Sequence, residues 1–298
     1  VGQVMTESGP QRRIGDAPAF RRLLNAVLLV AATEASLLLI GEDGTGKECL
    51  AREIHRLGTR RDGPFEVVRV AGLTEEDAVT ALDGAFLAAR GGSLLVDQVG
   101  ELTTSGQARL LRWLEGPGGE VRVMAASRQD LWGQVRGGSF RDDLYYRLCV
   151  VPLELPPLRE RIQDVGPLLE HFLASAATTH GVARPRFSLT AQRQLRRYAW
   201  PGNLRELRNF CERMVILCPG RDLGPDNLPP EIRQGGLHGE EGPGFKLPAS
   251  GIKLRDLEID VLRQALALAG GNKSRAARLL GLTRDTLLYR LNKYLIRA

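Results

Sequence analysis

Short apolar runs alternate with longer amphipathic patterns over the first half of the chain. Four runs have the length and composition of buried β-strands. They are SLLLIG (36–41), FEVVRV (65–70), GSLLVD (92–97) and VRVMAAS (121–127). Stretches between them, such as 46–57 and 101–115, have the spacing of helices. This alternation is typical of a parallel sheet with helices on both faces, so we predict an α/β fold for this part.

The second half of the chain changes character twice. From about residue 160 to 217 only helical patterns continue, which predicts a small helical lid. Residues 219–251 hold fourteen Gly or Pro and no periodic apolar pattern, so we predict a linker there. Three helical patterns follow. The predicted organisation is an N-terminal extension (1–13), an α/β core (14–158), a helical lid (159–218), a flexible linker (219–251) and a small all-α domain (252–298).

The excess positive charge lies at the end of the chain. Residues 251–298 contain ten Lys or Arg against four Asp or Glu, which accounts for the whole formal net charge of +6. A charged face can be simply solvated, but this concentration favours a polyanionic partner.

Other bulk features narrow the class of protein. No apolar run approaches the length needed to cross a bilayer, and the N-terminal segment has no apolar signal core. We therefore expect a cytoplasmic protein with no membrane partner. The four cysteines and four histidines are scattered, which favours reduced thiols and ordinary histidines over a metal site. The chain starts at Val1, which leaves open that sequence upstream is missing.

A phosphate-binding pattern follows the first predicted strand. In SLLLIGEDGTGKECLAREIH, Gly41, Gly46 and Lys47 satisfy G-x4-G-K, in which backbone N–H groups and a helix N-terminus hold phosphates. Lys47 would reach the terminal phosphates. A glycine-rich turn with a chance lysine is the alternative, but the flanking strand and helix favour nucleotide binding. The other candidate nucleotide-binding residues of this loop are Glu42, Asp43, Gly44, Thr45 and Glu48.

Three long motifs closely resemble the NtrC family of bacterial enhancer-binding proteins. They are GEDGTGKE (41–48), FRDDLYYRLCVVPLELPPLRERIQDV (140–165) and WPGNLREL (200–207), and the likeness runs from about Ile14 to the end. Members are AAA+ activators of RNA polymerase that carries sigma-54. The resemblance implies an AAA+ core with a helical lid, a helix-turn-helix domain, and rings that hold ATP and Mg²⁺ between subunits. The implied partners are RNA polymerase and further copies of the chain, as a dimer or a ring.

The resemblance also assigns individual residues. Asp97 matches the acid that helps hold Mg²⁺, and Arg205 matches the sensor arginine of the lid. Arg141 and Arg147 match two arginines offered to the ATP of a neighbouring subunit, where they stabilise charge on the transferring phosphoryl group. Each arginine could instead form an ordinary surface ion pair.

Three positions depart from the family pattern. Gln98 stands where the family has the Glu that orients and activates water. Because Gln cannot accept a proton, hydrolysis is expected to fall by about 10²–10⁴-fold. Arg69 and Arg128 stand where the family has Asn, and these cations still favour a polyphosphate. We therefore predict a site that binds ATP but hydrolyses it poorly.

The letters GAF (84–86) invite comparison with the family's GAFTGA loop, which contacts the sigma factor. The spacing from Gly84 to Asp97 instead matches the family's helix and acidic strand without a gap. We therefore predict that GAF lies in that helix. The sigma-contact loop would lie between Leu73 and Gly84, and we predict that it is deleted.

The C-terminal segment resembles the Fis-type helix-turn-helix module of the family. Thr283 can cap its third helix. Arg284 and Thr286 begin this helix and are candidates for contacts to bases or nearby phosphates. The full set of candidate DNA contacts is Lys273, Arg275, Thr283, Arg284, Thr286, Tyr289, Arg290 and Lys293. Among these, we expect four basic residues mainly to contact phosphate: Lys273, Arg275, Arg290 and Lys293. The alternative is a three-helix bundle with a solvated basic face.

Three functional hypotheses follow. The first is a regulator that binds double-stranded DNA and ATP, hydrolyses ATP poorly, and acts as a repressor or with the housekeeping polymerase. The second is an active ATPase that remodels sigma-54 polymerase, alone or in mixed rings. The third is an interaction protein with a dead nucleotide site.

Overall fold

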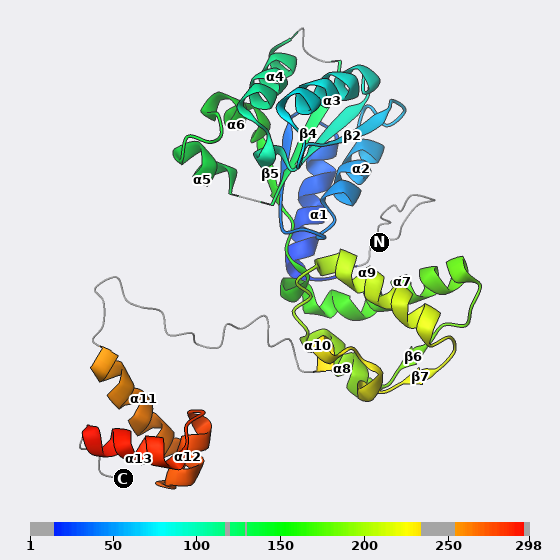
Figure 1. Cartoon of the computed structure of the whole chain (residues 1–298). Coiled ribbons are helices and arrows are strands. Elements are labelled where there is room, and N and C mark those ends of the chain that lie inside the picture. Colours follow the sequence, from blue (N-terminus) through cyan, green and yellow to red (C-terminus); the bar gives the residue numbers. More distant parts are fainter. Residues whose placement is uncertain (1–14, 117–119, 129, 234–253, 295–298) are drawn as a thin grey trace. The chain divides into compact units, whose positions relative to one another are not determined.

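The computed structural model describes residues 15–116, 120–128, 130–233 and 254–294. The chain divides into two compact units, Val1–Gly239 and Glu240–Ala298. The first unit contains an α/β core followed by a helical subdomain, and the second contains three helices (Figure 1).

The core is built on a five-stranded parallel sheet in the order β2-β3-β4-β1-β5. Its strands are β1 (Leu37–Ile40), β2 (Phe65–Arg69), β3 (Ser93–Asp97), β4 (Arg122–Ser127) and β5 (Val151–Glu154). The four predicted strands are confirmed as β1 to β4. The edge strand β5 escaped prediction because it is only four residues long and contains Pro152, a residue tolerated at sheet edges.

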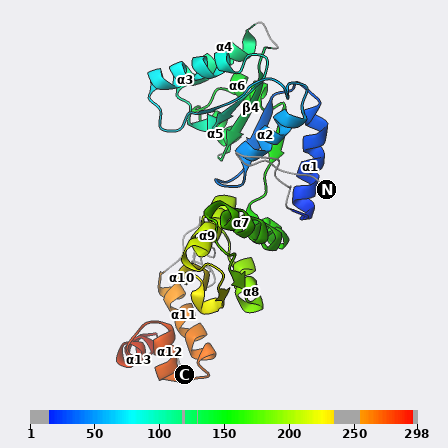
Figure 2. The ribbon, with the colours of Figure 1, turned by 90° about the vertical axis from the view of Figure 1, so that its right-hand side faces the viewer.

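Helices cover both faces of the sheet (Figures 1 and 2). Leu37 and Leu39 of β1 pack in one apolar cluster with α1 and α2, whereas Leu38 packs in another with α3 and α4. Burial on both faces explains why the strands read as nearly continuous apolar runs. The helices of the core are α1 (Pro18–Ala31), α2 (Lys47–Leu57), α3 (Glu75–Ala88), α4 (Thr104–Glu115), α5 (Leu131–Arg136) and α6 (Asp142–Leu148).

The GAF letters lie inside helix α3. Residues 70–74 alone connect β2 to this helix, whose first turn is capped by the Thr74 hydroxyl accepting the N–H of Asp77. The Phe86 side chain is 3% exposed, and its ring stacks on Trp113 with centroids 4.8 Å apart. The structure therefore places this phenylalanine in the core, in the helix that precedes the acidic strand, as the spacing predicted.

The helical subdomain packs around the buried residues Trp200 and Phe210. Its main elements are the 3₁₀ segment η2 (Leu158–Asp164), α7 (Val165–His180), α8 (Leu189–Arg197) and α9 (Asn203–Leu217). A two-stranded sheet joins β6 (Arg186–Phe187) to β7 (Asp222–Leu223).

This subdomain extends beyond the predicted lid. After α9, β7 is followed by η3 (Pro225–Asn227) and α10 (Pro230–Arg233). Leu223, Leu228 and Ile232 are buried in the same apolar core. The linker was predicted from residue 219, because isolated apolar residues between glycines and prolines leave no periodic signal. Residues 234–251 of that prediction lie outside the described residues.

The second unit consists of α11 (Leu254–Leu268), α12 (Lys273–Leu279) and α13 (Arg284–Lys293), which confirms the three predicted helical patterns. Its core joins Leu262 and Leu266 of α11 to Leu287 and Leu291 of α13, over two alanines of α12. The Thr283 hydroxyl accepts the N–H of Thr286 at 3.2 Å, which confirms the predicted cap. Within the residues that the structure describes, no helix has both the length and the apolarity to span a membrane.

Candidate functional site

The phosphate loop connects β1 to α2 at the carboxyl edge of the sheet. Gly44 and Gly46 adopt φ values of 76° and 101°, a region that other residues rarely occupy. A Cβ on Gly44 would lie 2.2 Å from the carbonyl oxygen of Gly202. No side chain caps α2 at Gly46. Its first N–H groups therefore form the type of helix N-terminus that attracts phosphate.

Lys47 extends back over this loop. Its Nζ donates to the carbonyl oxygens of Gly41 at 2.7 Å and Glu42 at 2.9 Å. Burial lowers the pKa of the Lys47 ammonium, although the charges of Asp43 and Asp97 oppose this effect. The ammonium is thus held inside the loop, close to two acidic groups.

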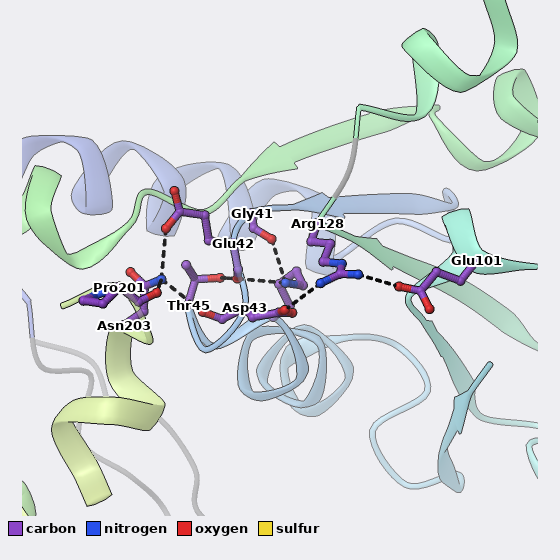
Figure 3. Close-up of polar contacts among 9 residues, drawn as sticks. Gly41, Glu42, Asp43, Thr45, Glu101, Arg128, Pro201 and Asn203 are labelled. Carbon is purple, nitrogen blue, oxygen red and sulfur yellow. Dashed lines mark hydrogen bonds and ion pairs between the residues drawn. The ribbon is translucent and has the colours of Figure 1, made fainter. Parts of the chain in front are cut away.

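Glu42 joins the loop to the helical subdomain (Figure 3). Its carboxylate accepts hydrogen bonds from Arg159 Nη1 at 2.8 Å, Arg159 Nη2 at 2.6 Å and Asn203 Nδ2 at 3.1 Å. The Asn203 amide also donates to the carbonyl oxygen of Asp43 at 3.0 Å and accepts the N–H of Leu158 at 2.7 Å. The Arg159 hydrogen bond is the main cause that lowers the pKa of Glu42.

A second buried contact reinforces this connection. Arg161 of η2 is 2% exposed, and its Nη2 donates to the carbonyl oxygen of Thr45 at 3.3 Å. Its guanidinium lies over the ring of Phe20, 4.9 Å from the centroid. Burial lowers the pKa of Arg161 to about 10. Sequence reasoning missed the roles of Arg159, Arg161 and Asn203, although all three lie in the quoted motifs.

Arg205 lies beside the loop, with its Cβ close to Gly44, and its role as a sensor arginine stays a prediction. It belongs to α9 and lines a cavity of about 430 Å³ together with Asp43, Trp200 and Phe210. Its charge contributes to lowering the pKa of Lys47. The position of Arg205 is therefore compatible with a contact to phosphate.

Asp97 and Gln98 end β3 at the same edge. Burial raises the pKa of the Asp97 carboxyl, against the opposing charge of Lys47. Gln98 takes a left-handed conformation with φ 59° and begins a 3₁₀ turn. In the sheet register Asp97 lies opposite Arg69 of β2.

Arg69 and Arg128, the two arginines that stand where the family has Asn, both form ion pairs with acidic residues near the loop. Arg69 Nη2 donates to Glu48 Oε2 at 2.6 Å, in the first turn of α2. Arg128, just after β4, places Nη1 3.4 Å from Asp43 Oδ2 and Nη2 3.0 Å from Glu101 Oε1 (Figure 3). The substituted positions are thus brought together with the phosphate loop.

Arg141 and Arg147 belong to a different place in the core. Both are exposed, Arg141 at the start of α6 and Arg147 within it, and each makes an ion pair within its own chain, Arg141 with Asp143 and Arg147 with Glu115. The backbone N–H of Arg141 donates to Oε1 of the buried Gln107 at 2.9 Å. Gln107 fixes the start of α6, a role that no sequence motif indicated.

The second unit presents most of its candidate DNA contacts to solvent. Lys273, Arg275, Arg284 and Lys293 are exposed, and Tyr289 is 67% exposed. Two other candidates, Thr286 and Arg290, contact residues of the unit itself. The Thr286 hydroxyl lies 2.7 Å from that of Thr283. Arg290 forms an ion pair with Glu258 of α11, whose carboxylate also accepts the Tyr294 hydroxyl at 2.6 Å.

Three protein families match successive parts of the chain. The sigma-54 interaction domain matches residues 13–154, and the AAA+ ATPase lid domain matches residues 159–243. The bacterial regulatory protein family of Fis type matches residues 253–294. The α/β core, helical lid and helix-turn-helix unit predicted from the sequence are therefore confirmed.

Relatives match along nearly the whole chain. The transcriptional regulatory protein ZraR of Klebsiella oxytoca is 38% identical over 310 residues, which cover 94% of this chain and 68% of ZraR. The DNA-binding transcriptional regulator NtrC of Azospirillum brasilense is 34% identical over 325 residues, covering 92% and 67%. The crystal structure of NtrX from Brucella abortus in complex with ATP superposes with a TM-score of 0.69 at 31% identity, covering 94% and 69%. The chain therefore belongs to the NtrC family of bacterial transcriptional regulators, which combine an AAA+ sigma-54 interaction domain with a Fis-type helix-turn-helix.

Proposed function

We propose that this protein is a sequence-specific DNA-binding transcriptional regulator whose AAA+ domain binds ATP with Mg²⁺ and hydrolyses it poorly. The observation that carries the proposal is the contrast at one edge of the sheet. The phosphate loop and Lys47 have the arrangement that binding requires, whereas Gln98 follows the acidic strand where the family has its catalytic Glu.

ATP binding is supported by geometry and by kinship. The positive φ values of Gly44 and Gly46 shape a loop that leads into the N-terminus of α2. The related NtrX of Brucella abortus has been crystallised with ATP. Asp97, with its half-buried carboxyl beside Lys47, is the residue that would help hold Mg²⁺.

Weak hydrolysis follows from the chemistry of the carboxamide. A water molecule aligned for attack must lose a proton, and Gln98 can orient water but cannot accept that proton. Arg69 forms an ion pair with Glu48, and Arg128 forms ion pairs with both Asp43 and Glu101. Neither cation can serve as the missing base, because guanidinium stays protonated.

The connection between β2 and α3 argues against contact with sigma-54 in the family's usual way. Only residues 70–74 separate the two elements, and Phe86 is part of the core. A surface loop carrying GAF would require unfolding of α3. We therefore propose regulation by repression, or with the housekeeping polymerase, in which bound nucleotide sets the oligomeric state.

A second function is favoured by Arg141 and Arg147. Both remain exposed in α6 or at its start, so they could serve the ATP site of a neighbouring subunit that supplies its own Glu and sigma-contact loop. Mixed rings would then activate sigma-54 polymerase.

Three measurements decide between these functions. Equilibrium dialysis of the full chain with ATP tests binding, and turnover is compared between the wild type and a Gln98→Glu variant. We expect binding, little turnover, and higher turnover in the variant. Robust wild-type hydrolysis would overturn the proposal, and sigma-54-dependent transcription in a purified system would then support the second function. Absence of ATP binding would indicate a purely structural AAA+ body.

A further inference from the structure

We propose that Arg69 supplies, beside the phosphate loop, positive charge that Mg²⁺ would otherwise supply, so that nucleotide binding at this site depends only weakly on Mg²⁺. This inference rests on the proposed nucleotide binding and goes beyond it, because it assigns a cation of the chain to the two acids that a bound metal ion would meet. These acids are Glu48, which follows Lys47 in the chain, and Asp97, which ends β3.

The side chains of Arg69 and Asp97 lie on the same face of the sheet. Side chains alternate between the two faces along a strand. Val67 of β2 and Leu95 of β3 belong to the apolar cluster that α2 also forms. Arg69 and Asp97 stand two residues further along these strands, and they lie opposite one another in the register. Both therefore share the face that α2 covers, and Glu48 lies in the first turn of that helix.

Glu48 accepts a guanidinium group on each of its carboxylate oxygens. Arg69 Nη2 donates to its Oε2 at 2.6 Å, and Arg52 Nη2 donates to its Oε1 at 2.8 Å. In the general phosphate-loop pattern the residue after the lysine is Ser or Thr, whose hydroxyl binds Mg²⁺. Here that residue is an acid with both oxygens engaged, so a metal ion would have to displace an arginine to bind it.

The charge of Arg69 also acts on Asp97. Burial raises the pKa of the Asp97 carboxyl, and the positive charges of Lys47 and Arg69 oppose this effect. Mg²⁺ binds carboxylates through its charge, and the charge of this carboxylate is already balanced in part by the chain itself. Mg²⁺ that arrives with ATP can still contact Asp97, but we expect it to add little affinity.

A cation in this place is suited to phosphates as well as to acids. Lys47 is held over the loop by two carbonyl oxygens, next to the N-terminus of α2 where phosphates would bind. The Arg69 side chain is 65% exposed, which leaves room for its guanidinium to turn toward an entering phosphate. A guanidinium stays protonated and needs no metal ion from solution.

Arg52 offers a matched comparison with Arg69. It donates to the other oxygen of Glu48, but from the next turn of α2, and its guanidinium lies over the ring of Phe65, 4.8 Å from the centroid. Arg69 instead stands opposite Asp97 in the sheet. Removal of either arginine frees one oxygen of Glu48, whereas removal of Arg69 also takes a cation away from Asp97.

The test is isothermal titration of the full chain with ATP, in excess Mg²⁺ and again in EDTA. We expect the wild type to bind ATP with affinities that agree within about threefold between the two buffers. Arg69→Asn should bind about tenfold more weakly than the wild type in EDTA, the scale of one hydrogen bond to a charged group, and within about threefold of it in Mg²⁺. Arg52→Asn should behave like the wild type in both buffers.

Arg69→Lys separates the charge of Arg69 from its shape. The described contact of Arg69 to Glu48 is one hydrogen bond, which an ammonium can also make. The lysine variant should therefore keep the weak dependence on Mg²⁺. If it loses affinity in EDTA as much as Arg69→Asn does, a positive charge at this position does not replace the metal ion, and the inference is wrong.

The other failures are distinguishable. If the wild type binds ATP in neither buffer, the proposed function fails. If it binds ATP in Mg²⁺ and much more weakly in EDTA, or if Arg69→Asn binds like the wild type in EDTA, the role of Arg69 is wrong while nucleotide binding stands. Equal losses in Arg69→Asn and Arg52→Asn would also overturn it, because the effect would then come from Glu48 alone. Circular dichroism checks that each variant folds.

Discussion

The buried amide of Asn203, at the start of α9, donates to the carboxylate of Glu42 in the phosphate loop at 3.1 Å. The same side chain accepts the N–H of Leu158, so three segments distant in sequence meet on one residue. Asn203 has φ 51°, a left-handed conformation that Asn tolerates better than most residues. Asn203 thus helps to hold the phosphate loop against the helical subdomain, together with Arg159 and Arg161, and its residue type suits both the hydrogen bonds and the backbone conformation.

Replacement of Asn203 should destabilise the AAA+ unit. Asn203→Ala removes partners from buried polar groups, which costs about 1–3 kcal/mol, and puts in the left-handed region a residue that tolerates it less well than Asn. Asn203→Gly removes the same hydrogen bonds, but glycine adopts the left-handed conformation readily. This variant should therefore be less destabilised than Asn203→Ala. Urea denaturation measures both. Asn209→Ala, at an exposed position of the same helix, is the control and should stay within about 0.5 kcal/mol of the wild type. Equal stability of all four proteins would contradict this role of Asn203.

The Glu42–Arg159 contact should make stability depend on acid pH. Arg159 lowers the pKa of Glu42 from its ordinary value of 4.5. A carboxyl whose pKa is lower in the folded state stabilises the fold above 4.5, and this contribution is lost as the pH falls through the folded value. The effect is reduced by solvent, since both side chains are more than 40% exposed, at 46% and 41%.

Denaturation at pH 7 and pH 3 isolates this contribution when the wild type is compared with Arg159→Gln. The variant should be less stable at pH 7, and the difference should shrink at pH 3. Other carboxyls titrate in the same range, but they do so in both proteins and cancel in the difference. A gap that persists or widens at pH 3 would mean that Arg159 acts through packing and not through the charge of Glu42.

Truncation of Phe86 tests where the GAF letters lie. Phe86→Ala should lower the free energy of unfolding by about 3–5 kcal/mol, because it removes a buried ring stacked on Trp113. Leu87→Ala is a matched control in the same helix, since Leu87 is 55% exposed. If Phe86 occupied a surface loop, the two variants would have similar stability.

Much of this architecture could be predicted from the sequence, for reasons that differ between elements. The strands β1, β3 and β4 are buried on both faces and the edge strand β2 is partly buried, so their apolar runs are visible without knowledge of the fold. The phosphate loop is local in sequence, and two of its glycines, Gly44 and Gly46, adopt the positive φ values that favour glycine. Both kinds of signal are contained in a short segment.

The contacts that sequence reasoning missed are long-range. Glu42 and Asn203 are 161 residues apart, and nothing in either segment specifies the other. Arg290 was predicted to face phosphate from its place on the helix, but its partner Glu258 lies 32 residues away on α11. An ion pair between two helices depends on their packing, which the periodicity of one helix does not determine.

This ion pair separates Arg290 from the other candidate DNA contacts. Lys293→Ala should weaken DNA binding, and it should reduce the slope of log K against log salt by about one, because one phosphate contact is lost. Its effect on stability should be small, since Lys293 is exposed. Arg290→Ala should instead destabilise the helix-turn-helix unit. The Glu258 carboxylate accepts hydrogen bonds from Arg290 and Tyr294 in the described structure, and this variant removes the first of them.

A Glu258→Gln variant tests the same ion pair from its acidic side. If Arg290 is mainly structural, Glu258→Gln and Arg290→Ala should lower the melting temperature of the unit similarly, and Glu258→Gln should leave the salt slope unchanged. Fluorescence anisotropy with an operator fragment, measured over a range of salt, gives the slopes. Should Arg290→Ala reduce the slope by about one and leave the melting temperature unchanged, Arg290 would be a phosphate contact that leaves Glu258 when DNA binds.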